Sequence, residues 1–303
     1  MNYNAIILAA GKGTRMKSDF PKCAFPFFGK PMISYIINSC KKANVSDICV
    51  VVGHKKEVME DILKDEVQYA YQDEQLGTGH AVKCAKSFFQ DKEGVTLIFP
   101  GDMPLVDYNT IADLINQHIS NGNDLTVVTT IVDNPTGYGR IVRKSGQIIK
   151  IVEEKEANEK QKLVKEINTG LYCINTNLLE STLEKINNNN IKQEYYLTDI
   201  VEILGSTKKV NSFVVVDDFR LTGINDLYTL SKVEKRYQEE INLNHMLNGV
   251  HLISPETILI EDTVVIEENV TIDAGSIIRG NTVLTKGTYI EPLSLIVDGV
   301  KIK

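Results

Sequence analysis

Short apolar runs alternate with amphipathic segments along residues 4–225. The runs predict buried strands at residues 4–10, 47–52, 67–71 and 95–99. The amphipathic segments between them predict helices at residues 32–43, 57–63 and 78–89, the last with Thr78 as a cap-competent start. More β-structure is expected at residues 125–132, 138–144 and 147–153, with a turn at Ser145–Gly146. Alternation of this kind predicts a parallel sheet covered by helices on both faces.

The pattern changes from Asn225 onward, where apolar residues follow helical spacing up to a cap at Asn248–Gly249. Behind this helix the sequence repeats every six residues, with an aliphatic residue at each repeat: Ile260, Ile266, Ile272, Ile278, Leu284, Ile290, Ile296 and Ile302. A small or β-branched residue stands two positions before each of them: Ile258, Val264, Val270, Ser276, Thr282, Thr288, Ser294 and Val300. This hexapeptide pattern is typical of a left-handed parallel β-helix, whose aliphatic side chains fill the axis. Residues 258–303 would supply roughly two and a half coils.

The most informative segment is the loop after the first strand. It reads GKGTRMKSDFPK and contains two glycines together with Lys12, Arg15 and Lys22. Glycine lets backbone N–H groups approach an anion closely, and the cations supply charge. A strand that runs into such a loop builds a phosphate site at the carboxyl end of a parallel sheet. The alternative is an ordinary strand-to-helix turn with a solvated basic rim.

Two common phosphate motifs fail at this loop. A P-loop needs a second glycine before its Lys-Ser/Thr pair, and a dinucleotide fingerprint needs a third glycine. Met16 occupies both of those positions. The loop instead resembles the nucleotidyltransferase signature L-A-A-G-x-G-T-R-M…P-K.

Two further features follow strands of the same predicted sheet. The segment QDEQLGTGHA, residues 72–81, places Gly77, Thr78 and Gly79 where backbone donors and a hydroxyl could grip a base or sugar; a plain helix start is the alternative. Gly101–Asp102 follows the strand at residues 95–99 and puts a carboxylate at the edge where open α/β sheets bind ligands. Asp102 could equally serve as a turn residue.

Composition narrows the class of protein. The chain has 303 residues, 43% hydrophobic and 24% charged, which is enough for a real core and two domains. A net charge of -7 disfavours a general nucleic-acid binder. No membrane span and no signal peptide are expected. The five scattered cysteines form no C-x-x-C pair, which fits reduced thiols in a cytoplasmic protein.

Ordered motifs from Tyr3 to about Val250 resemble the uridylyltransferase half of the bacterial GlmU family. They are LAAGKGTRM, GKPM, VVGH, QLGTGHA, GDMPL, GYGRIVR, IVEEKEA, EINTGLY, EYYLTDI and GIND. The resemblance implies an α/β fold: a Rossmann-like nucleotidyltransferase domain with a mixed sheet over residues 1–225, a connecting helix over 226–250 and a short left-handed β-helix over 251–303. It also implies transfer of UMP from UTP to N-acetylglucosamine 1-phosphate, giving UDP-N-acetylglucosamine and pyrophosphate.

The resemblance assigns roles residue by residue. Arg15 and Lys22 would be catalytic and lie on the UTP phosphates, and Asp102 with Asn225 would bind Mg²⁺. The remaining assignments are substrate contacts: Leu8, Ala9, Ala10, Gly11, Gln72, Gly77, Thr78 and Gly101 for the nucleotide side, and Gly139, Glu153 and Asn168 for the sugar. Hard oxygen ligands suit Mg²⁺, and the sugar phosphate is already anionic, so the reaction needs alignment and charge neutralisation rather than a base.

Some positions depart from the family pattern. Pro100 replaces the usual tyrosine before Gly-Asp, Cys-Ala-Phe-Pro replaces Val-Leu-His after Lys22, and Leu221–Thr222 precedes the Gly-Ile-Asn-Asp motif. All five histidines precede the repeats, so acetyl transfer to glucosamine 1-phosphate is not expected. Two alternatives stay open: another nucleotide and sugar 1-phosphate pair, or a non-catalytic regulatory paralogue. Oligomerisation through the β-helix also stays open.

Overall fold

The computed structural model describes residues 2–216 and 218–302. The chain forms two compact units. The first comprises the residues up to Phe25 together with Met32–Asn225. The second comprises Pro26–Pro31 and the residues from Asp226 onward. The chain therefore passes from the first unit into the second at two points, after Phe25 and after Asn225, and returns once, after Pro31.

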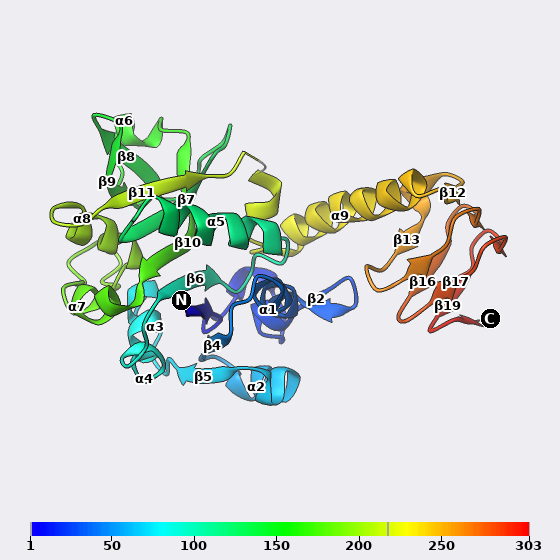
Figure 1. Cartoon of the computed structure of the whole chain (residues 1–303), viewed down its shortest axis with the longest axis horizontal. Helices are drawn as coiled ribbons and strands as arrows, with labels where there is room; N and C mark the ends of the chain where they lie inside the picture. Colours follow the sequence, from blue (N-terminus) through cyan, green and yellow to red (C-terminus); the bar gives the residue numbers. More distant parts are fainter. Residues whose placement is uncertain (1, 217, 303) are drawn as a thin grey trace. The chain divides into compact units, whose positions relative to one another are not determined.

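A mixed sheet forms the centre of the first unit (Figure 1). Its main path runs in the order β11-β7-β10-β6-β1-β4-β5, and β8 and β9 extend it beside β10. The strands β1, β4, β5 and β6 are parallel, whereas β10 runs antiparallel to both β6 and β7. The strand bounds are β1 Tyr3–Leu8, β4 Asp47–Val52, β5 Gln68–Tyr71, β6 Val95–Pro100, β7 Leu125–Ile131, β8 Arg140–Lys144, β9 Gln147–Val152, β10 Glu166–Asn175 and β11 Val210–Val214.

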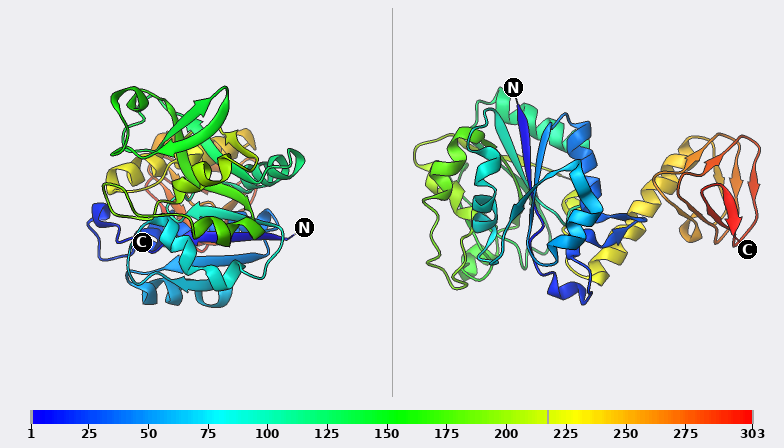
Figure 2. Two further views of the ribbon diagram at one scale, coloured as in Figure 1. Left: turned by 90° about the vertical axis from the view of Figure 1, so that its left-hand side faces the viewer. Right: turned by 90° about the horizontal axis from the view of Figure 1, so that it is seen from below.

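Helices cover both faces of this sheet (Figure 2). One face packs against α1, α2 and α5, and the other packs against α3, α4, α7 and α8. The bounds are α1 Met32–Lys42, α2 Lys56–Leu63, α3 Thr78–Cys84, α4 Lys86–Phe89, α5 Tyr108–Ser120, α6 Glu159–Lys162, α7 Leu179–Leu183 and α8 Ile200–Gly205. This three-layer arrangement confirms the helix-covered sheet predicted from the alternating pattern. The sheet is mixed, as the family resemblance implied, rather than wholly parallel as the pattern predicted, because β10 runs antiparallel to its neighbours.

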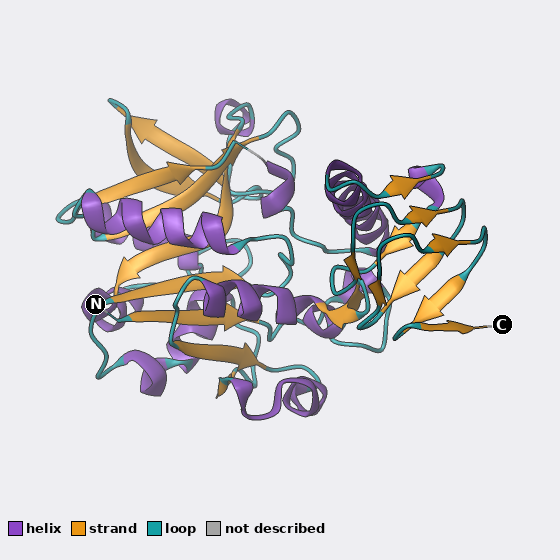
Figure 3. Ribbon diagram, turned by 45° about the vertical axis from the view of Figure 1, so that its right-hand side comes forward, coloured by secondary structure: helices purple, strands orange, loops and turns teal. Residues whose placement is uncertain are grey.

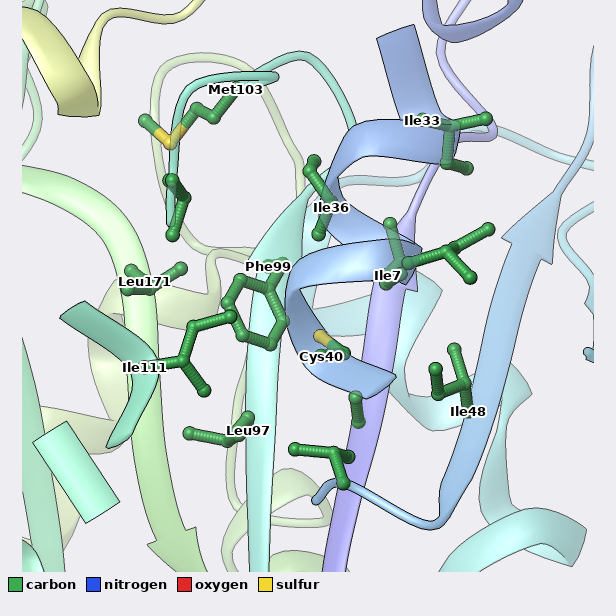
Figure 4. Close-up of a cluster of buried hydrophobic side chains, with 14 of the residues drawn as sticks. Ile7, Ile33, Ile36, Cys40, Ile48, Leu97, Phe99, Met103, Ile111 and Leu171 are labelled. Atoms are coloured by element: carbon green, nitrogen blue, oxygen red, sulfur yellow. The ribbon is translucent and has the colours of Figure 1, made fainter. Parts of the chain in front are cut away.

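Successive side chains of a strand point to opposite faces of the sheet, so one strand contributes to the hydrophobic clusters on both faces. In β1, Ile7 points into the cluster beneath α1, while Ile6 belongs to the cluster on the opposite face. Figure 4 shows Ile33, Ile36 and Cys40 of α1 lying over the strands at the first of these clusters. Because both faces are buried, the central strands β1, β4 and β6 are apolar at most of their positions.

The second unit contains one long helix and a stack of short strands (Figure 3). Helix α9 spans Leu227–Leu247, and Gly249 after it has a φ of 86°, the left-handed cap expected there. Before the stack, residues 26–31 form the hairpin β2 Pro26–Phe27 and β3 Lys30–Pro31. The stacked strands are β12 His251–Leu252, β13 Leu259–Ile260, β14 Val265–Ile266, β15 Thr271–Ile272, β16 Ile277–Arg279, β17 Val283–Leu284, β18 Tyr289–Ile290, β19 Leu295–Val297 and β20 Val300–Ile302.

Pairing within the stack confirms the hexapeptide repeat. Ile260 pairs with Ile278 and Ile278 with Ile296, so parallel neighbours are three hexapeptides apart. These three isoleucines are buried. Each triplet of hexapeptides therefore forms one coil of a short parallel β-helix.

The last repeat departs from the prediction. Ile302 is 46% exposed rather than on the axis, because β20 turns back and pairs antiparallel with β19. Asp298 and Gly299 both have positive φ, which is the backbone of a tight two-residue hairpin turn. The hexapeptide spacing continues through this turn, so the sequence pattern alone did not reveal the reversal.

Three local predictions also need correction. The strand expected over residues 4–10 ends at Leu8, and the helix expected over 78–89 breaks at Ala85 into α3 and α4. The Thr78 side chain caps no helix; its Oγ1 accepts a hydrogen bond from the Leu197 amide at 3.1 Å. The turn at residues 145–146 is confirmed by positive φ at both positions. In the described ranges 2–216 and 218–302, no helix is both long and apolar enough to cross a bilayer.

Burial on the β-helix axis leads to a stability prediction. Replacing the fully buried Ile278 by alanine should lower the free energy of unfolding by about 2–5 kcal/mol, since it removes apolar contacts and leaves a cavity. Val283→Ala is the matched control, because that side chain is 59% exposed and its loss should cost under about 0.5 kcal/mol. Urea unfolding measures both. Equal losses would contradict the assignment of Ile278 to the axis.

Candidate active site

A pocket of about 440 Å³ opens in the first unit where strands of the sheet end. The residues after β1, β5 and β6 contribute to it, as do residues of β10 and the segment 192–198. Ligands of open α/β sheets bind at this carboxyl edge because the loops of neighbouring parallel strands meet there.

A cluster of two cations and two oxygen ligands lies at one end of the site. Lys22 Nζ donates to Asp102 Oδ2 in a short contact and to Asn225 Oδ1 at 3.0 Å. Arg15 donates to the same Asn225 oxygen at 2.7 Å. Four residues that the sequence predicted as catalytic or metal-binding are thus brought together from three distant segments.

Local backbone geometry explains why these segments meet. Gly13 has a φ of 58°, and a Cβ there would lie 2.7 Å from Lys22 Cβ, so only glycine permits the two ends of the basic loop to approach. The Gly101 amide donates to the Leu8 carbonyl at 2.9 Å, which places Asp102 beside the end of β1. The Ile224 amide donates to the Asp102 carbonyl at 2.9 Å and brings Asn225 next to the carboxylate.

The donor set fits a hard divalent cation. Asp102 supplies a carboxylate oxygen and Asn225 an amide oxygen, and both contact the same ammonium group, so both face a point where positive charge is favourable. The Asn225 amide nitrogen donates to the Gly223 carbonyl at 3.2 Å, which turns its oxygen toward the cluster. In the described part of the chain, no group of three or more His, Cys, Asp or Glu side chains gathers elsewhere as a metal site.

Lys22 remains charged in this environment. Burial lowers the pKa of its ammonium group, but the negative charge of Asp102 and the hydrogen bond to it more than reverse that effect and leave the pKa raised. The cation that the sequence predicted to contact phosphate is therefore protonated at neutral pH.

The predicted base-binding residues also lie in the pocket wall. Gln72 is buried, and its amide nitrogen donates to the Gly77 carbonyl at 3.0 Å and contacts His80 Nδ1 at 3.1 Å. Gly77 has a φ of 107°, and a Cβ there would lie 2.6 Å from the Tyr195 carbonyl oxygen. The loop is thus held rigidly against residues 194–198 with its backbone facing the pocket.

The predicted sugar-binding residues form a second group, which we call the sugar end. A Cβ on Gly139 would lie 3.6 Å from both Glu153 Oε1 and Asn168 Cβ, so the three residues adjoin. Thr198 donates to Glu153 Oε1 at 3.2 Å, and Asn168 Nδ2 donates to the Tyr172 hydroxyl at 2.8 Å. This end presents a carboxylate, an amide and a hydroxyl, groups that recognise polyhydroxylated ligands.

Burial weakens the acids at this end. It raises the pKa of Glu153 despite the hydrogen bond from Thr198 and the charge of Lys192. Burial, together with the charges of Glu202 and Glu153, raises the pKa of Asp199 to about 6. The local field at the sugar end therefore changes between acidic and neutral pH.

Most of the predicted site residues line the pocket. These are Leu8, Ala9, Ala10, Gly11, Lys22, Gln72, Gly77, Thr78, Asp102, Glu153 and Asn168. Gly101, Gly139 and Asn225 are outside that lining but contact or adjoin residues in it, and Arg15 donates a hydrogen bond to Asn225. Gly11 has open space where a Cβ would stand.

Sequence reasoning missed part of the pocket wall. Cys23, Gln75, Pro100, Gly170, Tyr172 and the segment 192–198 also line it. The EYYLTDI motif contained a signal for this segment, but its residues were not assigned. Pro100 and Gly170 fit each other closely, since a Cβ on Gly170 would lie 3.0 Å from Pro100 Cγ.

Comparison with known proteins identifies the class. The nucleotidyl transferase family model matches residues 4–232, so the chain belongs to that family. A "Bifunctional protein GlmU" of Acholeplasma laidlawii is 51% identical over 250 residues, which cover 82% of this chain and 54% of that protein. The GlmU protein of Caldanaerobacter subterraneus is 45% identical over 295 residues, covering 97% of this chain and 64% of its own length. The chain thus spans between about half and two thirds of these curated relatives.

A solved structure is similar in fold. A Bacillus anthracis protein described as a glucose-1-phosphate thymidylyltransferase aligns with a TM-score of 0.63 at 19% identity, over 77% of this chain and 94% of its own. At that identity the similarity shows the shared fold alone.

The raised pKa of Asp199 predicts how stability depends on pH. The folded state holds the Asp199 proton up to pH about 6, whereas an unfolded chain releases it near 3.8, so this group lowers the free energy of unfolding as pH rises between these values. Asp199→Asn should therefore stabilise the protein by roughly 1–2 kcal/mol at pH 7.5 and lose that advantage near pH 4. Urea unfolding at the two pH values measures the effect. The exposed Asp113→Asn is the control, and an advantage that grows toward pH 4 would contradict the prediction.

Proposed function

We propose that this chain transfers UMP from UTP to N-acetylglucosamine 1-phosphate and releases pyrophosphate, with Mg²⁺ as cofactor. The observation that supports this most strongly is the cluster of Lys22, Arg15, Asp102 and Asn225, which accompanies the polar group of Gly139, Glu153 and Asn168 at the same pocket. The substrate pair is the one implied by the resemblance of the sequence motifs to the uridylyltransferase half of the GlmU family, and the curated relatives carry the GlmU name.

The residues of the chain would act mainly by alignment. Lys22 and Arg15 would bind triphosphate oxygens, neutralise the charge on the α-phosphate and stabilise the departing pyrophosphate. The backbone of residues 8–11 and the rigid Gln72–Thr78 loop would hold the nucleoside, leaving the α-phosphorus facing the sugar end. Glu153 and Asn168 would orient the sugar so that its phosphate oxygen attacks in line.

Asp102 and Asn225 would hold Mg²⁺. When bound, the ion neutralises phosphate charge and fixes phosphate geometry. Lys22 Nζ contacts both of these oxygen ligands, so Lys22 would transfer part of its contacts from Asp102 to phosphate when substrates bind.

A direct assay tests the proposal. Purified protein with UTP, N-acetylglucosamine 1-phosphate and MgCl₂ should release pyrophosphate, and EDTA should abolish release until Mg²⁺ is added back. Release with a different nucleotide or sugar phosphate would replace the substrate pair but keep the reaction class. No release with any pair would contradict the enzyme and favour a regulatory role.

Removing the phosphate-facing cation should reduce turnover strongly. Lys22→Met should lower kcat by about 10²–10³-fold, because a preorganised donor to the transition state is lost. Lys144→Met removes an equal charge from an exposed hairpin and should leave kcat within about twofold. A Lys22→Met enzyme with wild-type turnover would refute the catalytic role.

The proposed metal ligand predicts a second loss. Asp102→Ala should abolish turnover, because it removes the carboxylate ligand, and raising Mg²⁺ should not restore it fully. Titration of activity against MgCl₂ for the variant and the wild-type protein measures this. Normal turnover at an unchanged Mg²⁺ requirement would remove Asp102 from the metal site.

A further inference from the structure

The side-chain amide of Gln72 is held in one orientation. Its nitrogen donates to the Gly77 carbonyl at 3.0 Å. Because a carbonyl oxygen only accepts hydrogen bonds, the atom that faces it must be the amide nitrogen and not the amide oxygen. The backbone of the same residue is fixed as well, since its N–H donates to the Val52 carbonyl at 2.8 Å and its carbonyl accepts from the Gln75 side chain at 3.2 Å.

His80 accepts the second hydrogen of this amide. Its Nδ1 lies 3.1 Å from the Gln72 amide nitrogen, which can only donate, so Nδ1 must be unprotonated and the ring must carry its proton on Nε2. Nε2 lies 3.8 Å from the sulfur of Cys84, which is four residues further along α3 and is a weak acceptor for that proton. The hydrogen-bond pattern therefore assigns the tautomer of His80.

The oxygen of the Gln72 amide remains available to a ligand. Among the described residues none donates to it, and it is not one of the unpaired side-chain atoms that are sealed from solvent. Gln72 lines the 440 Å³ pocket, whereas His80 lines a second cavity of about 410 Å³ together with Leu76 and Tyr195. His80 can therefore influence a bound nucleotide only through Gln72.

We infer that His80 is a positioning residue for base selection, which fixes the Gln72 amide so that only its oxygen is offered to the base. The inference rests on the proposed function. Uracil presents a ring N–H between two carbonyl groups, which a fixed acceptor can bind, whereas cytosine presents a lone pair at the same ring nitrogen. Turning the amide over to bind cytosine would place its oxygen against two acceptors, the Gly77 carbonyl and His80 Nδ1. A buried polar mismatch of this kind discriminates against the wrong ligand.

A substitution at His80 in the full-length protein tests this role. His80→Phe keeps a ring but removes the acceptor, so one of the two barriers to turning the amide over disappears. The ratio of kcat/KM for UTP to kcat/KM for CTP should fall about 10-fold, which corresponds to the net contribution of one hydrogen bond. The kcat with saturating UTP should stay within about threefold of wild type, because the phosphate-binding groups are unchanged. Pyrophosphate release with each nucleotide measures both values.

Two further variants separate the acceptor from the bulk of the ring. His80→Asn can place an amide oxygen near the position of Nδ1 and should keep the UTP-to-CTP ratio within about threefold of wild type. Lys83→Met is the matched control, because Lys83 is an exposed residue of the same helix that lines the second cavity, and it should leave the ratio unchanged. A merely structural role of His80 would lower kcat/KM for both nucleotides alike in His80→Phe.

The tautomer is measured independently of activity. Long-range proton–nitrogen NMR spectra of the wild-type protein, with His80→Phe to identify the signal, should show the ring proton on Nε2. A proton on Nδ1, or an unchanged UTP-to-CTP ratio in His80→Phe, overturns the inference.

Failure of the proposed function would be recognised separately. If the wild-type protein releases no pyrophosphate with any nucleotide, that function fails, and calorimetric dissociation constants for UTP and CTP replace the kinetic ratio as the test of His80, with the same fall expected. Should His80→Phe not fold, His80→Leu removes the same acceptor with a smaller side chain and is expected to show the same fall in the ratio.

Discussion

A single buried ammonium group, that of Lys22, connects the parts of this molecule on which the site depends. Its partners Asp102 and Asn225 come from segments 80 and 203 residues away in sequence. Burial without partners would make this charge costly, and burial with two oxygen ligands makes it favourable. The sheet, the basic loop and the residue before α9 must therefore come together before the charge of Lys22 is stabilised.

The carboxyl edge of the sheet brings these segments together. Parallel β1 and β6 end side by side, so a loop after one and a carboxylate after the other are neighbours without any special design. The glycines around this edge then remove the side chains that would keep the backbones apart, as Gly13 does against Lys22. The position of the Lys22 ammonium group therefore depends on three features: the charge of Asp102, the glycine at position 13 and the pairing of β1 with β6. A change in any of them would displace this group.

Much of this could be predicted from the sequence because the relevant signals are local and repetitive. Runs of apolar residues imply strands that are buried on both faces, and the sheet confirms this. The hexapeptide spacing implies a coil, which the strand pairing confirms. The reversal at Asp298–Gly299 was missed because an antiparallel strand also places side chains on alternating faces, so Ile302 kept the spacing of the repeat after the chain had turned. The spacing of the aliphatic residues shows a period along the chain, but it does not show whether a strand runs parallel or antiparallel to its neighbour.

The pocket wall shows a different limit. Lys22 and Asp102 are recognisable because glycine, charge and strand ends coincide in a short stretch. The residues of segment 192–198 line the same pocket only because the loop at Gly77 packs against Tyr195, a contact between positions more than a hundred residues apart. Such pairings become visible only when the tertiary structure is known.

Cys23 illustrates what this packing implies beyond the reaction itself. Its sulfur borders the pocket beside Lys22, where a nearby cation would ordinarily favour a thiolate. Burial and the charge of Asp102 prevail instead and raise the pKa of this thiol to about 12. At neutral pH roughly one molecule in 10⁵ carries the reactive anion, so peroxides and alkylating reagents would meet an inert sulfur. A site assembled around positive charge is thereby protected from oxidative damage at the residue next to its lysine.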